Sequence, residues 1–341
     1  MKTVADLVEG GVLRFAALPP NNPPSLDFAH YTIPLLEHDY PAKTAAMWNA
    51  VYRALGVSLG NIMLIGDPKR AAEIFAVFRV DEKYLGGGAG VGFKDKSLPC
   101  LDEIDHQAEA IGAVNFILKT AGGKLKGYNT DGVGFAQSLA ERFRRRHAQL
   151  AGKKIVVVGA GGTSNAVVFA LAEQGVHLVI LNRTAERAQN LAQKVNKFFR
   201  LTSDRKAHFG GEERTIAEVR DADAIVNVST KGSAGMLEPY SALAPIELPA
   251  TEENVRRNHR AAAEILAVLP RQAIVSDVVL VRGLTVMLAQ AQGAGFEILT
   301  GVPMVVNQGV EALWLSHQHE LKARGVPKEA VRDIMQQAAL G

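Results

Sequence analysis

The stretch Lys153–Arg187, KKIVVVGAGGTSNAVVFALAEQGVHLVILNRTAER, decides the fold of this chain. It opens with the apolar run Ile155–Val158, which is typical of a strand buried on both faces of a parallel sheet. A glycine-rich turn follows directly, and Ser164 has the side chain of a residue that caps the start of a helix. After that helix, a second strand over His177–Leu181 completes a βαβ unit. The stretch predicts a Rossmann domain built on a doubly wound parallel sheet.

The same stretch predicts a bound dinucleotide. Glycines let backbone amides approach a pyrophosphate, and the helix N-terminus presents free N–H groups to it. An NAD site usually has Asp or Glu at the end of the second strand, but this chain reads Asn-Arg-Thr over Asn182–Thr184, with Arg187 one helical step on. Guanidinium groups bind a 2′-phosphate that a carboxylate would repel, so we predict NADP(H). The expected cofactor contacts are Gly159, Ala160, Gly161, Gly162, Thr163, Ser164, Asn182, Arg183, Thr184, Arg187, Val228 and Gly301.

The composition narrows the class of protein. A length of 341 residues predicts two domains, and 48% hydrophobic with 21% charged residues is normal for a chain with a sizeable core. The net charge of +3 is too small to indicate a nucleic-acid or membrane partner. The single cysteine, Cys100, excludes an internal disulfide and fits a reducing compartment. Without a signal-peptide pattern or a long apolar run, we expect a cytoplasmic protein, and we predict no metal site.

Outside the dinucleotide stretch, the pattern is that of an α/β protein. We expect a strand-like run over Ile111–Asn115 and a helix over Ala45–Leu55. The glycine-dense segment Gly86–Gly92 lacks a clear strand-then-helix context, which favours a close-packed loop over a phosphate loop. Residues 237–270 are rich in charge and alanine, and we expect them to form a surface insertion with a helix over Glu252–Leu269.

Several short motifs together resemble the shikimate/quinate dehydrogenase family. Their order and spacing run over most of the chain, from about Trp48 to about Trp314. Each motif alone is weak, whereas the set is specific. The motifs are IGAVN (Ile111–Asn115), GYNTDGVGF (Gly127–Phe135), GAGGTSNA (Gly159–Ala166), NRTAER (Asn182–Arg187) and GVPMVVNQG (Gly301–Gly309).

The resemblance implies a domain arrangement and an activity. It implies a substrate-binding and catalytic α/β domain over residues 1–130, completed by C-terminal helices in 302–341, and a Rossmann NADP domain over 131–301. The activity implied is an NADP-dependent interconversion of a ring alcohol and ketone of shikimate, quinate or a related cyclic hydroxy acid. The implied partner is this small molecule, and the chain would be a monomer or a homodimer.

The resemblance also implies a catalytic lysine–aspartate pair, matched here by Lys96 and Asp131. A lysine can deliver the proton that ketone reduction needs, and a nearby carboxylate holds the ammonium in place. Lys94 is the first substitute for Lys96. By the same resemblance, Asn115 and Gln308 would hydrogen-bond substrate hydroxyls.

This chain departs from the family at the substrate contacts. The family reads G-x-N-V-T-x-P-x-K up to its lysine, whereas this chain reads GAGVGFKDK over Gly88–Lys96. The family's two carboxylate-binding serines fall at Ala42 and Thr44, and Lys43 could replace the lost one. The family's tyrosine after the late strand falls at Leu280.

These changes predict an altered substrate preference. Glycines at Gly90 and Gly92 would free volume, and the lost donors favour a related cyclic hydroxy acid or a bulkier ring compound over shikimate itself. Two other functions stay open. One is a regulatory NADP-binding protein that has lost turnover. The other is a different two-domain enzyme, such as a methylene-tetrahydrofolate dehydrogenase, which the sequence Asn129–Asp131 and the NRT tip disfavour.

Overall fold

The computed structural model describes residues 2–202 and 205–340, and the chain divides into two compact units. The first comprises Met1–Gly134 with Val305–Gly341, and the second comprises Phe135–Met304. The divisions fall inside two helices, α5 (Asp131–Arg144) and α11 (Val302–Ala323). The chain therefore enters and leaves the second unit through continuous helix.

The second unit is built on a six-stranded sheet in the order β12-β11-β10-β13-β14-β15. Every neighbouring pair in this sheet is parallel. Numbered along the unit, this is the order 3-2-1-4-5-6 of a Rossmann sheet, so the predicted doubly wound fold is confirmed. The strands are β10 (Lys154–Val158), β11 (His177–Leu181), β12 (His208–Gly210), β13 (Ala224–Asn227), β14 (Ile274–Asp277) and β15 (Glu297–Leu299).

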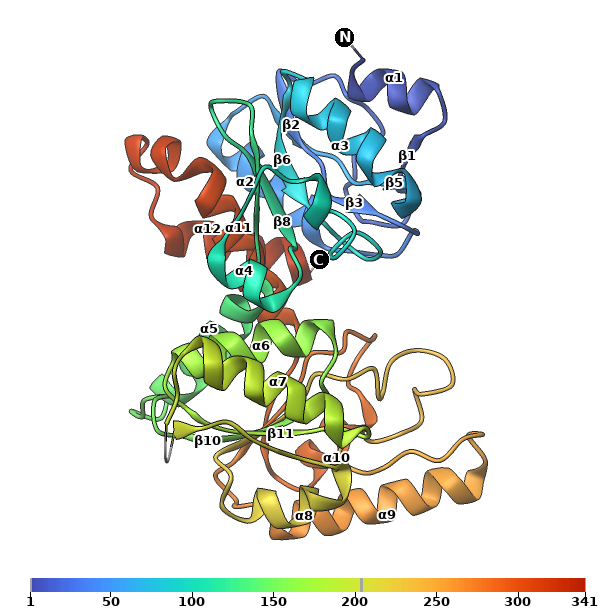
Figure 1. Cartoon of the computed structure of the whole chain (residues 1–341), viewed down its shortest axis with the longest axis vertical. Helices are drawn as coiled ribbons and strands as arrows, with labels where there is room; N and C mark the ends of the chain where they lie inside the picture. Colours follow the sequence, from blue (N-terminus) through green and yellow to red (C-terminus); the bar gives the residue numbers. More distant parts are fainter. Residues whose placement is uncertain (1, 203–204, 341) are drawn as a thin grey trace. The chain divides into compact units, whose positions relative to one another are not determined.

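Helices connect these parallel strands, as crossovers must (Figure 1). The prediction of a surface insertion over residues 237–270 is wrong. Its helix α9 runs from Glu252 to Val268 and lies in the chain between β13 and β14. Ala262, Ile265 and Leu266 of α9 are buried in the core of the unit, because a crossover helix must cover the sheet with its apolar face. The other main helices are α6 (Gly162–Glu173), α7 (Ala185–Phe198), α8 (Thr215–Glu218) and α10 (Val286–Gly293).

The start of α6 also differs from the expectation that Ser164 caps it. The helix begins at Gly162, and Gly161 is its N-cap. Ser164 lies in the first turn, where its Oγ accepts a hydrogen bond from the Gly161 N–H at 3.1 Å and donates one to the Val228 carbonyl at 3.1 Å. The serine therefore ties the glycine turn to the end of β13.

The first unit contains two sheets. The larger has the order β4-β2-β6-β8-β9-β7, and the smaller has the order β1-β5-β3. Both sheets mix parallel and antiparallel pairs, in contrast to the second unit. The strands are β1 (Leu13–Phe15), β2 (His30–Thr32), β3 (Leu35–Leu36), β4 (Leu59–Asn61), β5 (Leu64–Gly66), β6 (Tyr84–Gly88), β7 (Glu103–Ile104), β8 (Phe116–Lys119) and β9 (Leu125–Tyr128). The helices besides α5 and α11 are α1 (Val4–Glu9), α2 (Thr44–Leu55), α3 (Ala71–Val80), α4 (His106–Ile111) and α12 (Lys328–Leu340).

Two expectations for this unit are wrong. The glycine-dense segment is not all loop, because Gly86 and Gly87 lie in β6; a Cβ at Gly87 would come 2.1 Å from the Ile33 carbonyl oxygen. The strand expected over Ile111–Asn115 starts at Phe116. Ile111 ends a helix instead, since Gly112 adopts the left-handed conformation (φ 80°) that terminates α4.

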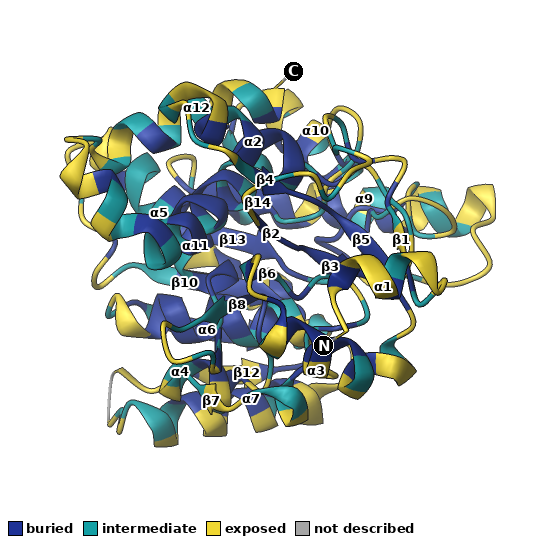
Figure 2. Ribbon diagram, turned by 90° about the horizontal axis from the view of Figure 1, so that it is seen from above, coloured by how far each residue is buried: buried dark blue, intermediate teal, exposed yellow. Residues whose placement is uncertain are grey.

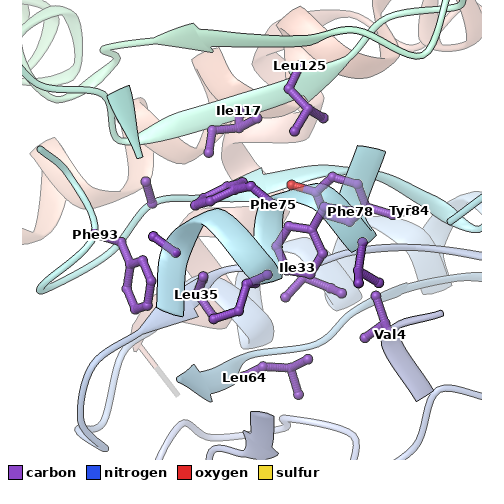
Figure 3. Close-up of a cluster of buried hydrophobic side chains, with 14 of the residues drawn as sticks. Val4, Ile33, Leu35, Leu64, Phe75, Phe78, Tyr84, Phe93, Ile117 and Leu125 are labelled. Atoms are coloured by element: carbon purple, nitrogen blue, oxygen red, sulfur yellow. The ribbon is translucent and has the colours of Figure 1, made fainter. Parts of the chain in front are cut away.

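Each sheet is covered by apolar side chains. Figure 2 shows β13 and β14 in the dark blue of buried residues, with exposed yellow on the outer faces of helices such as α9 and α12. In the first unit, Phe93 is fully buried in a cluster with Leu35 and Phe75 (Figure 3). Within the described ranges, none of the helices combines the length and the apolar character that crossing a membrane requires.

Candidate active site and dinucleotide site

The lysine that meets Asp131 is Lys94, not Lys96. The Lys94 Nζ donates a hydrogen bond to Asp131 Oδ2 and forms an ion pair with it. The side chain of Lys96 is 61% exposed and pairs with Asp95 at 3.5 Å. The predicted pairing of Lys96 with Asp131 is therefore wrong, and the lysine named as its first substitute takes the position.

The backbone explains why Lys94 points to Asp131. Phe93 is buried in the core, and the Lys94 carbonyl accepts a hydrogen bond from the Val114 N–H at 2.9 Å. The segment then coils, with the Ser97 N–H donating to the Phe93 carbonyl at 3.0 Å. In a helical turn, residues two apart face nearly opposite sides. When Lys94 faces Asp131, Lys96 must face solvent.

Asn115 organises the polar side chains around the pair. Its Nδ2 lies 2.9 Å from Asp131 Oδ1, 3.0 Å from Thr130 Oγ1 and 3.3 Å from Gln308 Oε1. Its Oδ1 accepts from the Thr130 N–H at 2.8 Å. Asn115, Thr130 and Asp131 are all buried. The side chains at positions 94, 115, 131 and 308 thus come together from four separate parts of the chain.

The pKa of Lys94 reflects opposing influences. Burial lowers it, whereas the charge of Asp131 and the hydrogen bond to that carboxylate raise it, with a smaller raising contribution from Tyr40. The result is a pKa above the ordinary lysine value. At neutral pH the side chain is therefore an ammonium held by a carboxylate.

Tyr40 interacts electrostatically with Lys94 and Asp131, which the residue pattern does not indicate. Burial raises the pKa of its phenol, the Lys94 ammonium lowers it, and the Asp131 carboxylate raises it again, with a net rise. Its segment lies beside the lysine segment, since the Glu37 N–H donates to the Val91 carbonyl at 3.0 Å. The available signal was an aromatic residue two positions before Ala42, where a family serine falls.

The idea that Gly90 and Gly92 free volume for a larger ring is wrong. A Cβ at Gly90 would lie 2.4 Å from Leu36 Cδ2, and a Cβ at Gly92 would lie 2.5 Å from Glu37 Cβ. Neighbouring side chains already fill these spaces. Lys43 and Thr44 lie at the start of α2, both half-buried, and their contact with substrate stays a prediction.

The second unit holds the expected dinucleotide turn. Gly159 follows β10 with φ +119°, and a Cβ there would lie 2.9 Å from the Ser229 N. Gly161 and Gly162 have no atom within 4 Å of where a Cβ would stand, so their backbone is open. This open backbone at the start of α6 fits a pyrophosphate, because small residues leave room for close approach. Thr163 follows in the first turn of α6.

The residues that follow β11, Asn182–Thr184 with Arg187, form a basic segment that is called the basic tip below. Asn182 Oδ1 accepts from the Ala160 N–H at 3.2 Å, and Asn182 Nδ2 donates to the Thr184 carbonyl at 2.9 Å. Asn182 therefore fixes the two segments to each other. Arg183 and Arg187 are exposed beside it, and two exposed guanidinium groups fit the 2′-phosphate of NADP. Gly301, the last predicted cofactor contact, is buried after β15; a Cβ there would lie 2.6 Å from the Val278 carbonyl oxygen.

Comparison with known proteins decides the family. The chain is 31% identical over 289 residues to the shikimate dehydrogenase (NADP(+)) of Methanopyrus kandleri, covering 84% of this chain and 89% of the relative. The chain belongs to the shikimate dehydrogenase family. The enzyme of the same name from Lysinibacillus sphaericus is 32% identical over 286 residues, covering 82% and 89%. Both relatives are, by name, NADP(+)-dependent shikimate dehydrogenases.

Family models and solved structures agree with this assignment. The model described as shikimate / quinate 5-dehydrogenase matches residues 139–209, and the shikimate dehydrogenase substrate binding domain matches residues 41–117. The crystal structure of shikimate 5-dehydrogenase from Thermus thermophilus in complex with NADP(H) and shikimate is 25% identical, with a TM-score of 0.62; the match covers 91% of this chain and 99% of that one. The described residues contain no group of three or more His, Cys, Asp or Glu side chains able to hold a metal ion.

Proposed function

We propose that this protein is an NADP-dependent oxidoreductase that interconverts the alcohol and ketone of shikimate or a closely related cyclic hydroxy acid such as quinate. The observation that carries the proposal is the Lys94–Asp131 pair, with Asn115 and Gln308 beside it. The names of the curated relatives support both shikimate and NADP. We propose Met1–Gly134 with Val305–Gly341 as the substrate unit and Phe135–Met304 as the NADP unit. The cytoplasmic location and the monomeric or dimeric state remain predictions.

In this proposal, Lys94 handles the proton. The Lys94 ammonium donates a proton to the carbonyl oxygen as the ketone becomes an alcohol, and the neutral amine accepts it in the reverse direction. Bound NADPH supplies the hydride that completes the reduction. Asp131 holds the ammonium in place, and its own Oδ1 is held by the Asn115 amide. Because the pKa of Lys94 is raised, the acid form persists through neutral pH, and alcohol oxidation should keep accelerating into the alkaline range.

Polar groups near the pair would orient the substrate. Gln308 Oε1 already faces Asn115, while its Nε2 donates to the Val305 carbonyl at 3.0 Å. A substrate hydroxyl could exchange with the longer of these contacts at little cost. Lys43 and Thr44 are the proposed anchors for the carboxylate, since a hydroxyl and an ammonium together can replace two serines.

The NADP residues would act by holding the cofactor. The open glycine turn and the start of α6 would bind the pyrophosphate. Arg183 and Arg187 would bind the 2′-phosphate, and Thr184, between them in sequence, adds a hydroxyl donor. Val228 would contact the cofactor through its backbone position at the end of β13, where its N–H donates to the Val158 carbonyl at 2.8 Å.

The test is a kinetic panel on the purified full chain. Shikimate, quinate and other cyclic hydroxy acids are each oxidised with NADP+ and with NAD+, and kcat/KM is compared. We expect turnover of shikimate or quinate and a clear preference for NADP+. Binding of NADP+ without turnover of any member would replace the enzyme by the regulatory alternative. The highest kcat/KM on an acyclic substrate would overturn the proposed substrate class.

A further inference from the structure

A buried ion pair lies under the carboxyl ends of the second unit's strands, apart from the residues assigned above. Lys231 Nζ is 2.8 Å from Glu212 Oε1, and each side chain is 10% exposed. The same Nζ donates to the Ala244 carbonyl at 2.9 Å. Burying two charged groups costs desolvation free energy, which is offset only when the ion-pair geometry and additional hydrogen bonds are good.

The strand order places this pair at the nucleotide end of the sheet. Lys231 follows β13, and its carbonyl is held by Asn227 Nδ2 at 3.1 Å. Glu212 follows β12, two residues after Gly210. Since the order is β12-β11-β10-β13, the pair joins the ends of two strands that flank β11 and β10. Those two inner strands carry the basic tip and the glycine turn.

The end of β12, which Glu212 follows by two residues, is also bonded to the segment of the arginine that would bind the 2′-phosphate. The Asn182 N–H donates to the Gly210 carbonyl at 3.2 Å, which joins the end of β12 to the residue before Arg183. The pKa of Lys231 agrees with this placement: burial lowers it, Glu212 raises it, and the positive charge of Arg183 lowers it, with a net decrease. The Lys231 ammonium therefore interacts electrostatically with both Glu212 and Arg183.

We propose that Lys231 is a specificity-determining positioning residue, which neutralises Glu212 so that Arg183 stays available for the 2′-phosphate of NADP. A carboxylate near the ribose is what an NAD site uses. An uncompensated Glu212 would attract Arg183 and repel the phosphate. In this proposal, the ion pair with Lys231 is the reason why the Glu212 carboxylate after β12 is compatible with NADP binding. This proposal rests on the proposed cofactor, but not on turnover.

The test measures binding by the full-length protein with calorimetry, using NADP+ and NAD+ and the fragments 2′,5′-ADP and 5′-AMP. For Lys231→Met we expect the Kd of NADP+ and 2′,5′-ADP to rise about tenfold, which matches a charge-assisted contact of about 1.4 kcal/mol. The Kd of NAD+ and 5′-AMP should change less than twofold. The double variant Lys231→Met/Glu212→Gln should recover most of the NADP+ affinity.

Two further variants keep this test decisive. Lys154 is the first residue of β10, at the opposite end of the sheet, and forms an ion pair with Glu218 at 3.4 Å. Lys154→Met breaks this pair and should leave the ratio of the NADP+ and NAD+ dissociation constants unchanged. Glu212→Gln alone should hold or tighten NADP+ binding even if Lys231→Met fails to fold. Equal effects on both dinucleotides, no recovery in the double variant, or weaker NADP+ binding in Glu212→Gln would each overturn the proposal. A wild-type chain that binds NADP+ but turns over no substrate would contradict the proposed enzymatic function without contradicting the proposed role of Lys231.

Discussion

The two units build their sites in different ways. In the second unit, one continuous stretch of the chain supplies the glycine turn, the helix start and the basic tip. In the first unit, the four site residues come from separate places: a turn (Lys94), the residue before β8 (Asn115), the start of α5 (Asp131) and the C-terminal helix α11 (Gln308). A contiguous site is held by local hydrogen bonds, whereas a dispersed site depends on every long-range contact that brings its parts together. The dispersed site is therefore where single substitutions should separate one neighbour from another most sharply.

The largest expected effect distinguishes two lysines two residues apart. Lys94→Met should lower kcat by about 10²–10⁴-fold, the usual contribution of a positioned general acid. Binding of NADP+ should be unchanged, because Lys94 lies in the first unit. Lys96→Met is the matched control and should stay within about twofold of wild type, as an exposed lysine paired with Asp95. A large loss in the Lys96 variant with an active Lys94 variant would reverse the assignment of the pair.

A pH-dependent stability should appear in the second unit. Asp277, at the end of β14, is fully buried, and burial raises its pKa to about 6 despite hydrogen bonds from the Val279 N–H, Thr285 and Asn227. Between its ordinary value of 3.8 and about 6, the folded protein binds more protons than the unfolded chain. The stabilisation is full below pH 3.8 and is lost as the pH rises through about 6; it amounts to at most about 3 kcal/mol.

Urea unfolding at pH 4.5 and pH 7.5 checks this expectation. Asp277→Asn should lose much less unfolding free energy between the two pH values than the wild type. The exposed carboxylate Asp95 provides a control, since Asp95→Asn should follow the wild-type pH dependence. Identical pH profiles for wild type and Asp277→Asn would show that the buried carboxylate does not titrate in this range.

The smallest effect concerns the residue that only the structure revealed. Tyr40→Phe removes a hydroxyl that interacts electrostatically with Lys94 and Asp131 and should lower kcat/KM for the cyclic acid by a few-fold. The pH at which alcohol oxidation accelerates should also shift, because the phenol and the ammonium interact. Tyr128→Phe, half-buried in β9 with Lys126 over its ring, is the control and should leave both quantities unchanged. Equal behaviour of the two variants would remove Tyr40 from the site.

The errors of the sequence reasoning have specific causes. The family pattern that ends in lysine fits better over Gly86–Lys94 than over Gly88–Lys96. Phe93 indicates this alignment, because a large apolar residue directly before the lysine must be buried. Gly90 and Gly92 were expected to open space, but neighbouring side chains fill it, which no reading of single residues could reveal. The helix in 252–268 has a strongly charged exposed face, which favours the interpretation as an insertion, although its other face packs in the core of the unit.

The sequence by itself determined the Rossmann sheet, the glycine turn and the basic tip, because these depend on strand and helix periodicity and on glycine at a strained turn within one short stretch. It also determined the family, through five motifs in fixed order. The tertiary structure alone decided which lysine meets Asp131, that Tyr40 interacts electrostatically with this pair, and that Lys231 forms an ion pair with Glu212. Those outcomes depend on the direction of a side chain in a coiled turn and on contacts between distant segments, and local sequence patterns predict neither of them.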